Sequence, residues 1–180
     1  MIAGGFGAGK TTMVRVVSEI EPLSTDGAMT TVSRGIDEPG EATRHKHTTT
    51  VALDFGRLTL DTDVVLYLFG TPGQSRFWFM WDQLAHGALG GVVLLDSRRL
   101  ADSFAAIDFF EDQDLPYVVA INRFDGVQPH DIEDVREALT IRSDIPLLSC
   151  DARDRDSVKA VLISLVEYVL RLRTSAALAG

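Results

Sequence analysis

The first eleven residues contain a glycine-rich run that ends in a lysine and a threonine. Gly4-Gly5-Phe6-Gly7-Ala8-Gly9-Lys10-Thr11 fits the pattern G-x-x-x-x-G-K-[ST] in full. Glycines let a backbone wrap closely around a phosphate chain, so that successive N–H groups point at it. A lysine in this place reaches the β- and γ-phosphates, and a threonine hydroxyl can ligate Mg²⁺. The run predicts a nucleotide phosphate site formed by Gly4, Gly5, Gly7, Ala8, Gly9, Lys10, Thr11 and Thr12, in which Lys10 is also catalytic.

A second polar motif, Asn122-Arg123-Phe124-Asp125, follows an apolar run far along the chain. The carboxylate of Asp125 could accept hydrogen bonds from guanine N1–H and N2–H₂, which adenine does not offer. Asn122 would brace this loop, and the stem of Arg123 could pack along the base. Asn and Asp also occur in ordinary turns. The motif follows a buried strand, and a phosphate loop precedes it in the chain. This position favours a guanine-reading loop over an ordinary turn.

The composition limits the partners. Lys and Arg number 17 against 26 Asp and Glu, a net charge of −9, which argues against nucleic acid or an anionic membrane as the main partner. The apolar runs are too short to span a bilayer, and one cysteine allows no disulfide framework. Neither a secretion signal nor a lipidation motif is visible. We expect a cytoplasmic protein without a lipid anchor, which partners could recruit to a membrane.

Short apolar runs alternate with helical patterns, which is typical of a mostly parallel sheet with helices on both faces. We expect one P-loop domain over residues 1–174, with a flexible tail over 175–180, and a six-stranded sheet with one antiparallel edge strand. Only Met1-Ile2-Ala3 precede the phosphate loop, so its leading strand is either abbreviated or continues upstream. The expected strands are Thr50–Phe55, Arg57–Leu60, Val64–Phe69, Gly91–Leu95, Tyr117–Ile121 and Pro146–Ser149. The expected helices are Lys10–Ile20, Arg76–His86, Leu100–Gln113, Asp131–Leu139 and Arg155–Leu172.

Two connections stand out. The three residues Asp61-Thr62-Asp63 are too few for a parallel crossover, so the strands on either side should form an antiparallel hairpin. The stretch from Glu21 to Thr49 has no sustained apolar periodicity and is expected to be a long loop, either functional or merely variable.

Further motifs resemble those of a Ras-like small GTPase, more narrowly the bacterial branch found in conservon operons and related to the gliding-motility polarity GTPase. Thr50-Val-Ala-Leu-Asp54-Phe55 resembles the switch I segment T-x-x-x-D-F. Phe69-Gly70-Thr71-Pro72-Gly73-Gln74 resembles the switch II segment W-D-T-A-G-Q, and Cys150-Asp151-Ala152-Arg153 resembles the S-A-K loop. The resemblance covers essentially the whole chain, with the motifs in the family's order.

The resemblance implies roles for these residues. Thr50 would sense Mg²⁺ and the γ-phosphate, Gly73 would bond the γ-phosphate, and Gln74 would orient the attacking water. Ala152 and Arg153 would lie at the guanine. It also implies GTP and GDP as ligands, a roadblock/LC7-type activating protein, and a sensor kinase in the same system.

The chain departs from the family pattern in switch II. The family's D-x-x-G aspartate is Gly70 here, and Asp54 is a candidate to replace its carboxylate. Pro72 should stiffen the segment before Gln74. Arg44 and Arg76 are candidates for an arginine acting in cis, and as single residues both also suit a solvated surface.

Four aromatic residues crowd into Phe77-Trp78-Phe79-Met80-Trp81. Five consecutive helical residues cover all sides of a helix, so they cannot all face one core. Phe77, Trp81 and Leu84 share a face that could pack on the sheet, which leaves Trp78 or Phe79 for the surface as a partner-docking patch. Full burial beneath the long loop is the alternative.

These motifs favour a GTP-binding switch with slow hydrolysis to GDP and phosphate, helped by an activating partner and acting in bacterial signalling. In it, GTP would order the 21–49 loop and hydrolysis would release that loop. The alternative is a nucleotide-dependent binding module with little or no hydrolysis. A third reading, a P-loop kinase of small substrates, needs an arginine-rich lid that the middle of the chain does not supply.

Overall fold

A computed structural model describes residues 1–21, 23–24, 27–29, 49–51, 53–73, 77–126 and 130–179. Its main sheet has seven strands in the order β2-β5-β6-β1-β7-β8-β9. Their bounds are β2 Leu23–Ser24, β5 Asp54–Asp61, β6 Val64–Gly70, β1 Ile2–Ala3, β7 Gly91–Leu95, β8 Tyr117–Asn122 and β9 Leu147–Cys150. A separate pair joins β3 (Gly27–Met29) to β4 (Thr49–Val51).

The predicted six-stranded sheet is confirmed, with one short addition. Strands β6, β1, β7, β8 and β9 are parallel, and β5 runs antiparallel to β6 across the predicted hairpin. The two-residue strand β2 then extends the sheet beyond β5. The central strand β1 is only two residues long and pairs with both β6 and β7.

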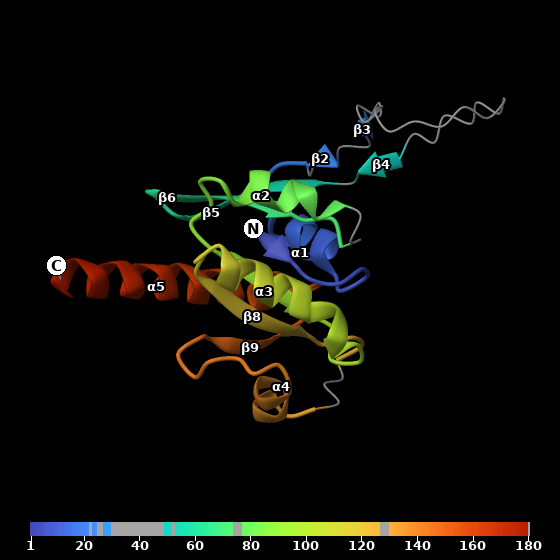
Figure 1. Cartoon of the computed structure of the whole chain (residues 1–180). Helices are drawn as coiled ribbons and strands as arrows, with labels where there is room; N and C mark the ends of the chain where they lie inside the picture. The colour runs from blue at the N-terminus through green and yellow to red at the C-terminus, as the bar shows by residue number, and fades with distance from the viewer. Residues whose placement is uncertain are drawn as a thin grey trace, which may run out of the picture.

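Helices cover both faces of the sheet (Figure 1). They are α1 Lys10–Val17, α2 Phe79–Ala85, α3 Phe104–Asp112, α4 Ile132–Ala138 and α5 Arg155–Ala179. A Cβ added at Gly90 would meet Leu165 of α5, whereas one at Gly91 would meet the ring of Phe110 in α3. Because successive strand residues point to opposite faces, α3 and α5 lie on opposite sides of β7.

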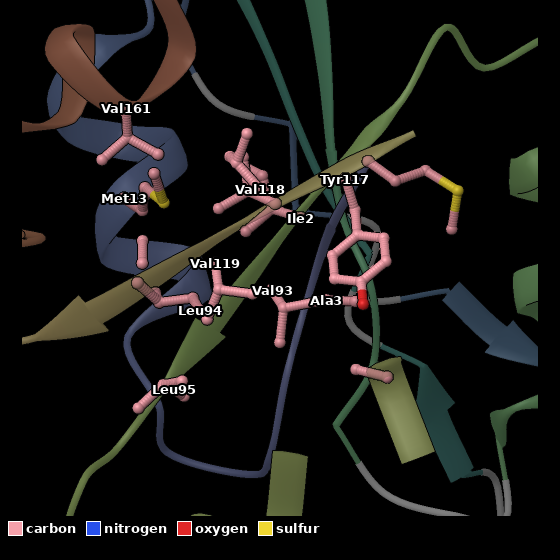
Figure 2. Packing of buried hydrophobic residues seen from close by; sticks show 14 of the residues in the cluster. Ile2, Ala3, Met13, Val93, Leu94, Leu95, Tyr117, Val118, Val119 and Val161 are labelled. Atoms are coloured by element: carbon pink, nitrogen blue, oxygen red, sulfur yellow. The ribbon is translucent and has the colours of Figure 1, made fainter. Parts of the chain in front are cut away.

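The core explains why β7 and β8 read as continuous apolar runs. Every residue of both strands is buried, because helices cover both of their faces. Figure 2 shows Met13 of α1 and Val161 of α5 near Val118 and Leu94, and α1 contacts α5 directly. This core holds the carboxyl ends of the strands in fixed positions.

Several predicted boundaries change. Thr50–Phe55 and Arg57–Leu60 are not two strands: Asp54–Asp61 is continuous and Thr49–Val51 pairs elsewhere. Gly56 does not break β5, because its missing side chain makes room for Val14 of α1, which a Cβ would meet at 2.8 Å.

Other elements also differ in extent. The segment predicted as a loop over Glu21–Thr49 contains the short strands β2 and β3 and the first residue of β4. Leu100–Ser103 form a 3₁₀ turn before α3 begins. Helix α5 continues past Leu172 to Ala179, so residues 175–179 are helical, and their flexibility stays a prediction. No helix in the ranges given above is both long enough and apolar enough to cross a bilayer.

Candidate nucleotide-binding site

Most of the predicted site residues that the structure describes lie at one edge of the main sheet. The phosphate loop follows β1, Asn122 ends β8, and the loop Asp151–Arg153 follows β9. The carboxyl ends of parallel strands, where the strand order reverses, are the usual ligand crevice of an open α/β sheet. Strand β1 lies at such a point, since β6 flanks it on one side and β7 on the other.

The phosphate loop needs glycine at particular positions. Gly4, Gly7 and Gly9 have φ values of 142°, 78° and 106°, which other residues rarely adopt. A Cβ at Gly9 would also lie 2.7 Å from Nδ2 of Asn122. Helix α1 begins directly after Gly9 with no acidic residue in its first turn. The loop therefore leads into a helix N-terminus whose dipole favours an anion.

Lys10 is buried at the base of this loop. Its ammonium group donates hydrogen bonds to the carbonyl oxygens of Gly4 (2.8 Å) and Gly5 (2.7 Å). Burial lowers the pKa of Lys10 to about 8, although the carboxylate of Asp54 works against that shift. An ammonium has three donors, so one remains for a phosphate.

Thr11 and Thr12 are exposed in the first turn of α1. The hydroxyl of Thr11 donates a hydrogen bond to Oδ2 of Asp54 at 2.5 Å. Thr50 lies in β4, where only its backbone is described. Gln74, Arg44 and Arg76 lie outside the described residues, so their predicted roles are not tested.

Gly73 packs against the phosphate loop. A Cβ there would lie 2.8 Å from both Nζ of Lys10 and the backbone nitrogen of Phe6. The chain before it is anchored, because Thr71 N–H donates to Ile2 (2.9 Å) and the Trp81 indole N–H donates to the carbonyl of Pro72 (3.2 Å). Gly73 is therefore placed beside the lysine predicted to bind the γ-phosphate.

Asn122 joins two loops. Its Nδ2 donates to the carbonyl of Ala8 (2.9 Å), and its Oδ1 accepts from the N–H of Ala152 (3.0 Å). The side chain is 5% exposed, and the two partners together fix the orientation of its amide. One residue thus holds the phosphate loop and the loop after β9 together.

The other residues of the predicted base-reading loop are placed beside it. Arg123 is half-buried, and its N–H donates to the carbonyl of Cys150 (2.6 Å). Asp125 has a left-handed backbone (φ 55°) and an exposed carboxylate. Arg153 forms an ion pair with it, Nη1 to Oδ1 at 3.3 Å. The structure therefore brings Asn122, Asp125, Ala152 and Arg153 close together, and their role in binding a base stays a prediction.

Sequence reasoning missed the segment after β7, which supports both halves of the site. Arg99 donates to the carbonyl of Phe6 (2.6 Å). Arg98 donates to both carboxylate oxygens of the buried Asp96, and these bonds hold the pKa of Asp96 below its usual value. The Arg98 guanidinium also lies 4.0 Å from the ring centre of Phe124. The signal was present, because Asp96-Ser97-Arg98-Arg99 directly follows a buried parallel strand.

The aromatic cluster 77–81 is divided between the core and the surface, which was the first of the two predicted alternatives. Phe77 and Trp81 are buried, and Trp81 packs edge-on to Phe109 of α3. Trp78 and Phe79 are 42% and 56% exposed. The alternative of full burial is wrong for these two residues.

Helix α4 begins at Ile132, one residue after the predicted start at Asp131. Asp131 occupies the N-cap position with an extended backbone, but its side chain makes no capping hydrogen bond.

The fold and the site define a P-loop nucleotide-binding protein with the architecture of a G domain. The chain belongs to the family described as conserved hypothetical ATP binding protein, whose pattern matches residues 2–172.

Two relatives illustrate the likeness. An uncharacterized protein of Methanocaldococcus jannaschii, MJ1339, is 33% identical over 104 residues. That match covers 57% of this chain and 66% of the relative, just under two thirds of its length. The crystal structure of the G domain of the T. maritima FeoB iron transporter has a TM-score of 0.62 and 18% identity, and the match covers 93% of this chain and 95% of the other. At that identity the likeness concerns the fold alone.

Proposed function

We propose that the protein is a GTP-binding switch that slowly hydrolyses GTP to GDP and phosphate. The observation that carries this proposal is the bridge made by Asn122 between Ala8 and Ala152. It supports the proposal because one side chain contacts both the phosphate loop and the loop after β9, so a nucleotide bound there would touch both loops.

The choice of guanine rests on Asp125. Its exposed carboxylate can accept two hydrogen bonds from guanine N1–H and N2–H₂, and adenine lacks both groups. Arg153 contacts one of its oxygens in the ion pair and leaves the second available. The family description names ATP, so the nucleotide is the first property to test.

For hydrolysis, we propose that Lys10 and Gly73 hold the γ-phosphate and that Gln74 orients the attacking water. Thr11 and Thr50 would hold Mg²⁺, which would neutralise charge on the phosphates. The donors fit this ion, because Mg²⁺ prefers oxygen ligands and takes most of them from phosphate and water. Within the described ranges no three His, Cys, Asp or Glu form a metal site, which agrees with such a sparse donor set.

The biological setting follows from the resemblance to the conservon-type small GTPases. We propose a role in bacterial signalling, with a roadblock/LC7-type activating protein and a sensor kinase as partners. A cytoplasmic location, with recruitment to membranes by those partners, belongs to the same proposal.

Calorimetric titration with GTP, GDP and ATP tests the nucleotide assignment. We expect binding of GTP and GDP and at least tenfold weaker binding of ATP. Equal affinity for ATP and GTP would remove the guanine assignment, and Asp125→Ala should abolish the preference without abolishing phosphate binding.

Release of phosphate tests hydrolysis. Gln74→Leu should slow turnover with and without a roadblock protein, whereas Gln113→Leu, a change at an exposed residue at the end of α3, should not. An unchanged rate in Gln74→Leu would exclude Gln74 from the mechanism.

A second function, nucleotide-dependent binding without useful hydrolysis, is favoured by the exposed Trp78 and Phe79 at the start of α2. It predicts that GTP stays intact for hours while partner binding still depends on the nucleotide.

A further inference from the structure

Asp54 and Gly70 lie directly opposite each other on β5 and β6, beside the phosphate loop. The strand register pairs Asp54 with Gly70, at the end of the sheet where Thr11 lies in the first turn of α1. Asp54 is 5% exposed, and among the residues that the structure describes no cationic side chain forms an ion pair with it, which is unusual for a buried carboxylate. A buried carboxylate beside a phosphate site needs an explanation.

Gly70 makes room for this carboxylate. A Cβ at position 70 would lie 3.1 Å from Cβ of Asp54 and 3.3 Å from its Oδ2. It would also lie 3.5 Å from Val14 of α1, an ordinary contact. A carboxylate at position 70 would therefore crowd the Asp54 side chain, which would have to shift by a few tenths of an ångström.

The hydrogen bonds show what the carboxylate does. Thr11 donates its hydroxyl proton to Oδ2, which leaves the lone pairs of that hydroxyl for a cation. Oδ1 is buried and accepts no hydrogen bond from the described residues. A buried anionic oxygen without a donor is costly, so this atom indicates a ligand that arrives from elsewhere.

We propose that Asp54 supplies the carboxylate of the Mg²⁺ site from strand β5, in exchange for the carboxylate that Ras-like proteins place at position 70. In this arrangement Oδ2 orients the Thr11 hydroxyl, and Oδ1 accepts a hydrogen bond from the hydration shell of the ion. The inference rests on the proposed function, since Mg²⁺ enters this site together with the phosphates.

If Asp54 had only a structural role, its hydrogen bond with Thr11 would be sufficient. Asp54→Asn separates the two roles, because its amide oxygen can still accept from Thr11 but the negative charge is lost. Asp61→Asn is the matched control, as Asp61 ends the same strand in an exposed position away from the phosphate loop. The double change Asp54→Gly and Gly70→Asp moves the carboxylate across the strand pair and removes the crowding.

The experiment measures the release of a fluorescent GDP analogue from the full chain over a range of Mg²⁺ concentrations and in EDTA. In Asp54→Asn we expect the Mg²⁺ concentration for half-maximal slowing of release to rise about 10- to 100-fold. Release in EDTA gives the Mg²⁺-free reference rate for each variant, and Asp61→Asn should match the unsubstituted protein throughout. The exchanged double variant should recover about tenfold or more of the lost Mg²⁺ sensitivity.

Two results would overturn the inference while the proposed function stands. One is an Asp54→Asn protein that binds GDP and keeps the original Mg²⁺ dependence. The other is an exchanged variant that binds GDP normally in EDTA yet needs as much Mg²⁺ as Asp54→Asn does; this variant also provides the test if Asp54→Asn does not fold. Failure of the unsubstituted protein to bind any nucleotide would overturn the proposed function itself.

Discussion

At the scale of single residues, Asn122 connects parts of the chain that are far apart in sequence. Its amide satisfies the carbonyl of Ala8 and the N–H of Ala152, both of which are buried. A buried backbone group that loses its partner carries the full cost of its desolvation. The residue therefore contributes to stability and holds the geometry of the site at the same time.

Asn122→Ala should lower the free energy of unfolding by about 1–3 kcal/mol, because two buried groups lose their partners. It should also weaken GDP binding at least tenfold, since nothing then holds the two loops together. Urea unfolding and calorimetry measure these effects, with Gln113→Ala as the control for losing an exposed amide. Unchanged stability and affinity would contradict the bridging role.

Lys10 makes binding depend on pH. Burial holds the pKa of this lysine near 8 in the nucleotide-free protein. A phosphate beside the ammonium favours its charged form and raises the pKa again. At pH 8 about half of the free molecules carry a neutral Lys10, so each binding event should take up about half a proton.

Calorimetry in two buffers with different ionisation enthalpies measures this uptake. It should fall towards zero at about pH 6.5, where the free lysine is already charged. Lys10→Arg is the control, since a guanidinium stays protonated and takes up no proton. Equal uptake in both proteins would exclude Lys10 as the source.

At the scale of helices and strands, the sequence predicts secondary structure best where the burial of an element follows a regular pattern. Strands β7 and β8 are buried on both faces, and α5 shows apolar residues at helical spacing, so local pattern and final structure agree. The two-residue strands β1 and β2 have too few residues to show a period. Pairing with distant residues decides their structure.

Gly56 and Asp54, both in β5, also owe their roles to contacts with distant residues, which the local sequence does not show. Gly56 reads as a break in the sequence but serves the close approach of α1. The contact of Asp54 with Thr11 depends on the β5–β6 register, which no local pattern gives. The phosphate loop and the Asn122 motif could be predicted because their chemistry is local. The polar residues 96–99 are visible in the sequence after a buried strand, but the contacts of Arg98 with Phe124 and of Arg99 with Phe6 could not be predicted, because they are made in space.

The contact between the β6–α2 connection and the phosphate loop also belongs to this scale. Gly73→Ala would bring a methyl group to 2.8 Å from the backbone of Phe6, so the connection must move away from Lys10. We expect at least tenfold weaker GTP binding with GDP affinity within about twofold, because only the γ-phosphate needs this contact.

Comparing GTP and GDP affinities by calorimetry checks this expectation. Gly87→Ala is the control: Gly87 has open space around it but a φ of 84°, so its change should cost stability without altering the preference. An equal loss of GTP and GDP affinity in Gly73→Ala would show a general distortion of the loop instead.

At the scale of the whole molecule, the protein and its proposed ligand carry charge of the same sign, because the chain is acidic and a nucleotide is a polyanion. The net charge of −9 opposes a nucleotide at long range, so the site must create its own local attraction. The N-terminus of α1 and the Lys10 ammonium supply it, and residues at the carboxyl ends of the parallel strands hold them in place. Because these parts come from the whole sheet, binding should stabilise the entire domain.

Nucleotide at a hundredfold excess over Kd should therefore add about 2.7 kcal/mol to the free energy of unfolding. For a domain of this size each kcal/mol raises Tm by about 2–4 °C, so GDP should raise Tm by about 5–10 °C. ATP at the same concentration should raise it far less, because adenine has no N1–H or N2–H₂ donor for the Asp125 carboxylate to accept from. Asp125→Ala should equalise the two shifts, and Asn122→Ala should reduce the GDP shift. A larger shift with ATP than with GDP would instead favour the nucleotide in the family's description.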